Sequence, residues 1–253
     1  MKLIKIWTQS SGFRMLWLKG IVLFIVTITL LSCTKMAMRM VSKIYKKPDV
    51  HYITDGDKIV AYIAMVHLNK KEFFDNAKST VDSLRKQGYS IFYESVKMSA
   101  ETDTLVQDTV YRKFRKIGGI HLTSYDNVDN KSIKKYQLNG LIAQTQDNTG
   151  VNSMTDIRAD IPLDSIIKLF ELDKGKILLS DCDYKTPLND KYNCSSVSKN
   201  IRDYLMLSIR NRVLADKIQS DNHSKIAVIY GLLHYKGVLE ELQKRNSEWH
   251  KVQ

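Results

Sequence analysis

Two ten-residue stretches, far apart in the chain, share one pattern of apolar and polar positions. Each begins with a lysine, continues through an almost unbroken apolar run rich in β-branched and aromatic residues, and ends with a histidine. They cover residues 58–67 and 225–234. Apolar runs of this length are typical of strands buried on both faces, as in the centre of a parallel or mixed sheet. We therefore predict two central strands that deliver His67 and His234 to their carboxyl ends.

The rest of the chain alternates between helical and extended spacing. Apolar residues at helical spacing predict helices over 70–87, 103–117, 132–144, 162–172, 197–219 and 238–244. A second buried strand is predicted over 89–96, and a short extended segment over 156–160. This alternation predicts an α/β fold with a central mixed sheet flanked by helices. Residues 51–253 are numerous enough to form a single domain with a sizeable core.

The N-terminal residues have the features of an export signal. Residues 1–32 carry four basic and no acidic side chains, and an apolar run over 21–31 is short for a membrane span, which needs roughly 20 residues. The sequence Leu30-Leu31-Ser32-Cys33 then resembles a bacterial lipobox. We expect a lipoprotein signal peptide over 1–32 and a lipid anchor on Cys33 that holds the protein to a membrane. The alternative is an uncleaved anchor with an incidental cysteine.

This interpretation places the protein in the bacterial cell envelope, facing the periplasm or the cell exterior. The remaining cysteines, Cys182 and Cys194, would then lie in an oxidising compartment, where we favour a disulfide between them. Two free thiols, or half of a metal site, are the alternatives, although the spacing fits no zinc pattern.

The chain has a formal charge of +12, and part of that charge lies in the segment 33–50, which we expect to be a basic tether. Such a segment beside a lipid anchor would favour an anionic membrane surface, or it is simply a solvated linker. We expect no nucleic-acid partner, because the protein is predicted to be exported and shows no basic recognition helix or stacking motif.

The candidate chemistry comes from three residues at strand ends. His67 and His234 end the two matched strands, and Glu94 lies near the end of the predicted strand 89–96. Two histidines and a glutamate form a set that catalytic zinc and related ions use, with one position left open for water. Taken singly, each has an ordinary explanation: a hydrogen-bonded structural histidine, or a glutamate paired with Arg210. No P-loop, G-x-S-x-G or H-E-x-x-H motif is present.

These residues resemble the TraB/GumN/Tiki superfamily, whose members carry two G-x-x-H motifs and a glutamate between them. The second motif matches Gly231-Leu232-Leu233-His234 with Gly237 after it, and the first matches Ala64-Met65-Val66-His67, with alanine in place of glycine. The resemblance covers roughly residues 57–245 and extends to Glu94, Arg210-Asn211, Gln137, Gln144 and Ala159-Asp160. It implies an α/β architecture similar to erythromycin-esterase-like and haem-binding ChaN-like proteins. Some eukaryotic members are described as metal-dependent proteases.

Together these features predict a lipid-anchored, metal-dependent hydrolase of a peptide or amide bond. His67, His234 and Glu94 would hold Mn, Co or Zn. Arg210 would stabilise an anionic intermediate or orient Glu94 as part of the catalytic group. The alternatives are a non-catalytic protein that binds a peptide, haem or another ligand on the same scaffold, and a structural envelope lipoprotein.

Overall fold

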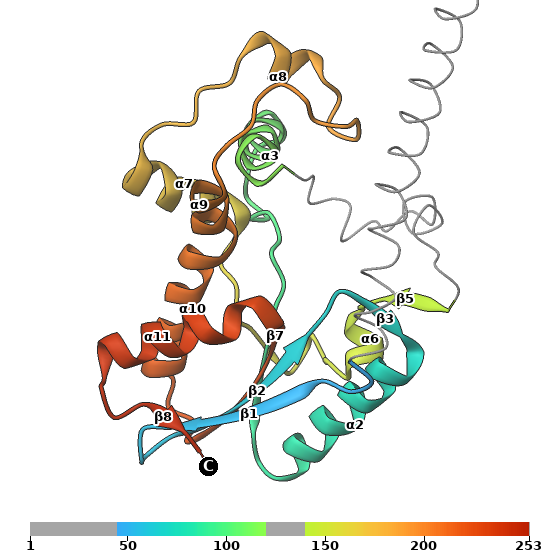
Figure 1. Cartoon of the computed structure of the whole chain (residues 1–253), viewed down its shortest axis with the longest axis vertical. Helices are drawn as coiled ribbons and strands as arrows, with labels where there is room; N and C mark the ends of the chain where they lie inside the picture. The colour runs from blue at the N-terminus through green and yellow to red at the C-terminus, as the bar shows by residue number, and fades with distance from the viewer. Residues whose placement is uncertain (1–44, 120–139, 253) are drawn as a thin grey trace, which may run out of the picture. The chain divides into compact units, whose positions relative to one another are not determined.

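A six-stranded mixed sheet forms the centre of the computed structural model, which describes residues 45–119 and 140–252 (Figure 1). Its strands, in spatial order, are β6 (Ile157–Arg158), β4 (Ser90–Tyr93), β7 (Lys225–Gly231), β2 (Ile59–Met65), β1 (Asp49–Thr54) and β8 (His250–Lys251). The first four of these run parallel to one another, whereas β1 is antiparallel to both β2 and β8. The predicted α/β fold with a central mixed sheet is therefore confirmed, and the residues from Lys46 onward belong to one compact unit.

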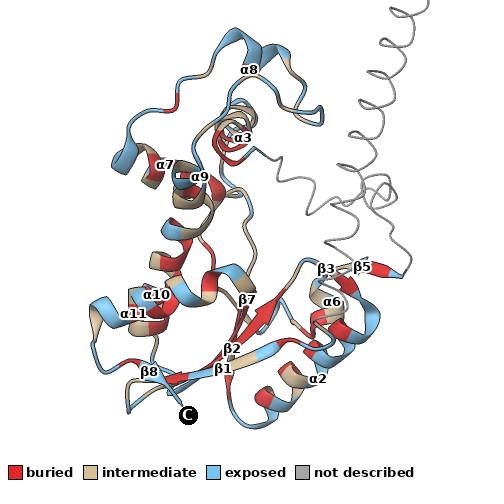
Figure 2. Ribbon diagram, in the orientation of Figure 1, coloured by how far each residue is buried: buried red, intermediate tan, exposed pale blue. Residues whose placement is uncertain are grey.

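The two matched strands lie at the middle of this sheet, as predicted, and the structure shows that they are neighbours. Figure 2 shows β2 and β7 among the most buried segments of the protein. Ile59 pairs with Lys225 and Met65 with Gly231, so the pairing is offset by one residue from the match in the sequence. Because side chains alternate between the faces of a strand, positions that match in the sequence point to opposite faces.

Helices cover both faces of the sheet. Helices α10 (Ile209–Ser220) and α11 (Tyr235–Arg245) lie on one side and α2 (Lys71–Lys86) on the other (Figure 1). The core beneath α10 and α11 is formed by apolar residues of both layers, among them Val60, Tyr62, Ala64, Val228, Tyr230, Leu214, Ile218, Val238 and Leu242. The predicted helices at 70–87 and 238–244 are thus confirmed as α2 and α11.

A second cluster of helices has an apolar core of its own. It consists of α3 (Thr104–Gly118), α7 (Leu163–Lys174), α9 (Lys199–Asp203) and η1, a π-helical turn at Tyr204–Ser208. Its buried residues include Phe114, Ile166, Phe170, Leu205 and Ile209. The long helix predicted over 197–219 is present, but η1 divides it into α9 and α10. A π turn inserts an additional residue and so rotates the face that the rest of the helix presents.

The prediction of a helix over 132–144 is wrong for residues 140–144, the part that the structure describes. Leu141–Ala143 form a strand, β5, that pairs antiparallel with β3 (Leu68–Lys70). The short apolar run is ambiguous by itself, and pairing with β3 decides its conformation. Residues 132–139 lie outside the described residues. A single turn of helix, α6 (Gln146–Thr149), follows β5. The sequence pattern does not predict β1 or β8, the last two strands on one side of the sheet.

The predicted disulfide is confirmed, because Cys182 and Cys194 are bonded, with their Cα atoms 5.7 Å apart. The bond closes a loop that begins with the short helix α8 (Asp181–Lys185) and lies against α3. Cys33, the signal peptide over 1–32 and most of the tether lie outside the described residues. Within the described ranges, none of the helices is long and apolar enough to cross a membrane.

Candidate active site

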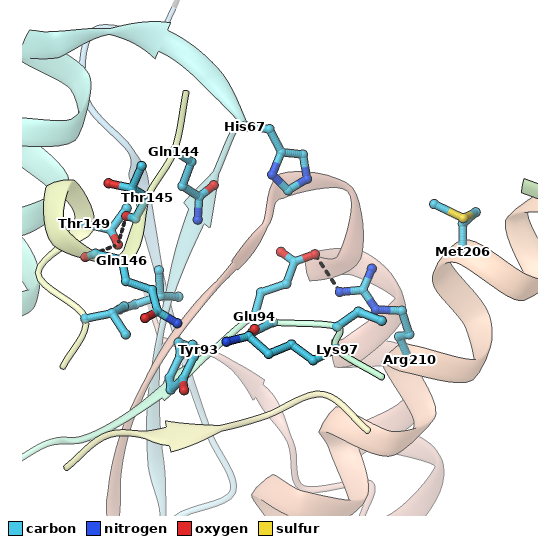
Figure 3. A pocket seen from close by; sticks show the side chains of 14 residues that line it. His67, Tyr93, Glu94, Lys97, Gln144, Thr145, Gln146, Thr149, Met206 and Arg210 are labelled. Atoms are coloured by element: carbon cyan, nitrogen blue, oxygen red, sulfur yellow. Dashed lines mark hydrogen bonds and ion pairs between the residues drawn. The ribbon is translucent and has the colours of Figure 1, made fainter. Parts of the chain in front are cut away.

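A cleft of about 380 Å³ opens at the carboxyl ends of the parallel strands. The chain passes from β2 through α2 to β4 and leaves a position between them, which β7 fills later from the opposite side. Open α/β sheets bind their ligands at such a change of strand order. His67 lines the cleft together with the charged residues Glu94, Lys97 and Arg210. Three of the predicted site residues therefore do share one cleft (Figure 3).

Glu94 is fixed in the cleft by contacts on both of its carboxylate oxygens. Arg210 Nη2 donates to Oε1 at 2.6 Å, and the backbone N–H of Gly231 donates to Oε2 at 2.6 Å. A Cβ atom on residue 231 would lie 3.2 Å from Oε2, which is tighter than nearly all ordinary contacts. A glycine at the end of β7 therefore allows the strand to approach the carboxylate. Arg210 is thus the ion-pair partner that the sequence suggested for Glu94.

A second carboxylate, that of Asp160, holds the other side of Arg210. Arg210 Nε donates to Asp160 Oδ1 at 2.8 Å, and Nη2 donates to Oδ2 at 3.0 Å. Asp160 also accepts hydrogen bonds from the backbone N–H of Ser95 and from the hydroxyl of Tyr230. In the sequence, Asp160 is marked only by a weak resemblance to the family, which predicts no role for it. Its position just after a short strand at the same edge of the sheet was the available signal.

His234 is buried behind Arg210, with only 4% of its surface exposed, and it does not line the cleft. Its Nδ1 lies 2.7 Å from Asn211 Oδ1, and its Nε2 lies 3.4 Å from Arg210 Nη1. Because a guanidinium only donates, Nε2 is the acceptor and Nδ1 carries the proton that it donates to Asn211. Gly237 makes room for this arrangement, since a Cβ there would lie 2.1 Å from Asn211 Nδ2.

The electrostatics of the cluster fix the charge of each group. Burial alone would raise the pKa of Glu94, but Arg210 and the nearby histidines lower that pKa to about 2. Burial lowers the pKa of His234, and the charge of Arg210 lowers it further, to about 3. Burial opposes the charge of Arg210 too, but Asp160 and the other partners hold its pKa well above the usual value. At neutral pH, Glu94 is therefore anionic, His234 neutral and Arg210 cationic.

His67 occupies a different environment from His234. It follows the end of β2, is exposed to solvent, and points into the cleft toward Glu94 (Figure 3). The difference follows from what succeeds each strand. After β7 the chain turns at once into η2 (Leu232–His234) and buries its histidine, whereas after β2 it continues into β3 and leaves His67 at the opening.

The side chains as arranged do not fit a divalent ion shared by His67, Glu94 and His234. Both oxygens of Glu94 and both ring nitrogens of His234 are already engaged, and the guanidinium of Arg210 contacts both residues. In residues 45–119 and 140–252, no group of three or more His, Cys, Asp or Glu side chains is placed to hold a metal ion. Metal binding at this set stays a prediction that would require these contacts to break.

Ala64, the departure from glycine in the first motif, lies within the regular part of β2. It pairs with Tyr230 on one side and Asp49 on the other, and its methyl group is buried in the core beneath α10 and α11. The backbone is extended there, so an alanine fits without strain. Unlike Gly231, this position does not have to admit a carboxylate.

Comparisons of the chain with protein-family models, with curated proteins and with solved structures found no match. Membership of the TraB/GumN/Tiki superfamily therefore stays a prediction that rests on the order and spacing of the motifs in the sequence.

Proposed function

We propose that the protein is an exported, lipid-anchored hydrolase of the TraB-like type that cleaves a peptide or amide bond in this cleft. The observation that carries the proposal is the exposed imidazole of His67 facing a buried carboxylate, Glu94, that other residues hold in place. An accessible histidine backed by a fixed anion is a common arrangement for moving protons during acyl transfer. The ChaN-like architecture implied by the resemblance belongs to the same proposal.

In this proposal His67 acts as the general base. It takes a proton from a water molecule, whose oxygen bonds to the carbonyl carbon of the substrate and forms a tetrahedral intermediate. The imidazolium then returns the proton to the leaving nitrogen as the C–N bond breaks. Glu94 stabilises the imidazolium but does not act as the acid, because its low pKa keeps it ionised at neutral pH.

Two cations line the cleft, and we assign them different roles. Arg210 is held by Glu94, Asp160 and His234, so it orients Glu94 and does not turn toward the substrate. Lys97 is exposed and lines the cleft next to Glu94 in Figure 3. Its ammonium group is the one placed to stabilise the negative charge that develops on the substrate oxygen.

The proposal is tested by incubating the mature protein with a library of fluorogenic peptides, with and without EDTA. We expect cleavage that persists after EDTA treatment. Activity that EDTA abolishes and that Mn, Co or Zn restores would instead support the metal centre predicted from His67, Glu94 and His234. Binding of peptides without cleavage under every condition would contradict the hydrolase and favour the ligand-binding alternative.

A further inference from the structure

Gln144 lies on the wall of the cleft that faces the candidate catalytic residues. It follows β5 directly, and its backbone N–H donates to the carbonyl oxygen of His67 at 2.9 Å. In Figure 3 its side-chain amide points into the space beside the His67 ring. The geometry of Gln144 is therefore coupled to that of the proposed base by a direct backbone contact.

The side-chain oxygen of Gln144 is buried and has no hydrogen-bond partner among the described residues. A buried carbonyl oxygen without a donor costs free energy, and native proteins rarely leave one without a reason. Turning this side chain further into the cleft breaks no hydrogen bond of that oxygen. The unsatisfied group is thus poised to exchange an unfavourable buried state for a contact with a ligand.

The residues of this wall that line the cleft carry no charge; they are Gln144, Thr145, Gln146, Thr149 and Val151. The side chain of Thr145 caps α6, and Asn148 Oδ1 accepts a hydrogen bond from the backbone N–H of Thr145. Asn148 Nδ2 also donates to the carbonyl oxygen of Ala143 at 2.8 Å. Gln146 adds a second amide to the lining of the cleft. The two neighbouring glutamines offer both donors and acceptors without charge, which suits a neutral amide better than a carboxylate or a phosphate.

We infer that Gln144 is a substrate-positioning residue that pairs its side-chain amide with a backbone amide group of the substrate. This inference rests on the proposed hydrolase function and specifies how that same site holds its substrate. Nε2 donates to a substrate carbonyl, and Oε1 accepts from a substrate N–H. Held in this way by residues after β5, the substrate presents its next carbonyl carbon to the water beside His67.

The test measures binding separately from turnover. Acetyl-tetraalanine amide offers backbone amides and no other hydrogen-bonding group, and a series of ester analogues removes its amide N–H groups one at a time. Affinities for the full-length His67→Ala protein are measured by NMR titration, following the side-chain NH2 signals of glutamine. The titration is repeated with Gln144→Met added to the same background, because methionine keeps the length of the side chain. Gln87→Ala serves as the control, since Gln87 is an exposed glutamine at the end of α2.

We expect the peptide to shift the Gln144 NH2 signals and Gln144→Met to weaken its binding roughly five- to tenfold, with no change for Gln87→Ala. One ester analogue should bind the His67→Ala protein more weakly than acetyl-tetraalanine amide does, by a similar factor. The protein that also carries Gln144→Met should bind this ester and the amide equally well. Binding that Gln144→Met leaves unchanged, or no binding at all, would overturn the inference. If binding depends on Gln144 but the wild-type protein cleaves no peptide, the hydrolase function is refuted and the role of Gln144 in binding is retained.

Discussion

The guanidinium of Arg210 contacts two carboxylates and a histidine in a largely buried cluster at the wall of the cleft, and each of those contacts depends on the others. Asp160 is the partner with the most contacts, because it also accepts from Ser95 and Tyr230. Removing one charge from such a buried set is costly, because the opposite charge is left without compensation.

We therefore expect Asp160→Asn to lower the free energy of unfolding by roughly 3 kcal/mol, as measured by urea denaturation. Asp75→Asn is the control, since Asp75 forms an ion pair with Lys71 that is exposed on both sides and should contribute little. Equal effects of the two substitutions would contradict the importance assigned to burial.

Gly237 provides a second test at this scale. In an exposed helix, replacing glycine by alanine usually stabilises by up to about 1 kcal/mol. Here the new methyl group would collide with the amide of Asn211, so Gly237→Ala should destabilise the protein and disturb His234. Adding Asn211→Ala removes the clash, and the double variant should be more stable than the sum of the two single effects predicts. Additive effects in a double-mutant cycle would show that the two residues do not interact.

The neutral state of His234 predicts how stability depends on pH. Its pKa is about 3 in the folded protein and 6.5 in a free histidine, so the unfolded chain binds the extra proton between these values. The contribution of His234 to the free energy of unfolding should be fully present above pH 6.5. It should fall on acidification by up to about 1.4 kcal/mol per pH unit. The lowered pKa of Glu94 adds to the loss below pH 4.5.

Unfolding free energies between pH 7 and 5 test this expectation. The His234→Gln variant should show a shallower dependence on pH than the wild type. An unchanged slope in His234→Gln would show that His234 is not held neutral.

Among the secondary-structure elements, the π turn η1 shows most clearly what the sequence could not reveal. The apolar spacing predicted one regular helix over 197–219, with Leu205 and Ile209 on its buried side. Both are buried, but beyond η1 the buried face also carries Arg210 and Asn211. No local pattern marks a π turn, because its presence depends on the carboxylates and the histidine that the rotated face meets.

The disulfide loop was predictable as a bond but not as a packed element. Arg115, only 1% exposed, donates to three backbone carbonyls of this loop, those of Asp183, Thr186 and Pro187. The disulfide closes this loop on itself, and Arg115 holds the closed loop against α3.

Replacing both Cys182 and Cys194 by serine should therefore loosen the loop without unfolding the sheet. We expect backbone amides of residues 181–194 to exchange hydrogen roughly tenfold faster or more, whereas amides of β2 and β7 keep their protection. Loss of protection in the sheet as well would show that the loop supports the whole fold.

For the whole molecule, the sequence predicted the fold class, the two buried central strands and the edge of the sheet at which the site lies, but not that the two strands are adjacent. It did not predict the register of β2 and β7, which is offset by one residue and sends matched positions to opposite faces. His67 and His234 are also equivalent in the sequence pattern. The pattern does not show that η2 buries His234, whereas the continuation into β3 leaves His67 exposed. Asp160 was missed because its contacts cross 50 residues or more.

The most direct test of the account is the value of kcat/KM for His67→Gln on a peptide that the wild type cleaves, measured together with the midpoint of urea unfolding. We predict a loss of at least about 100-fold in kcat/KM with an unchanged midpoint, because His67 is exposed and supplies the proton transfer. A variant that retains kcat/KM within about threefold of the wild type, too small a loss for a general base, would contradict the role of His67.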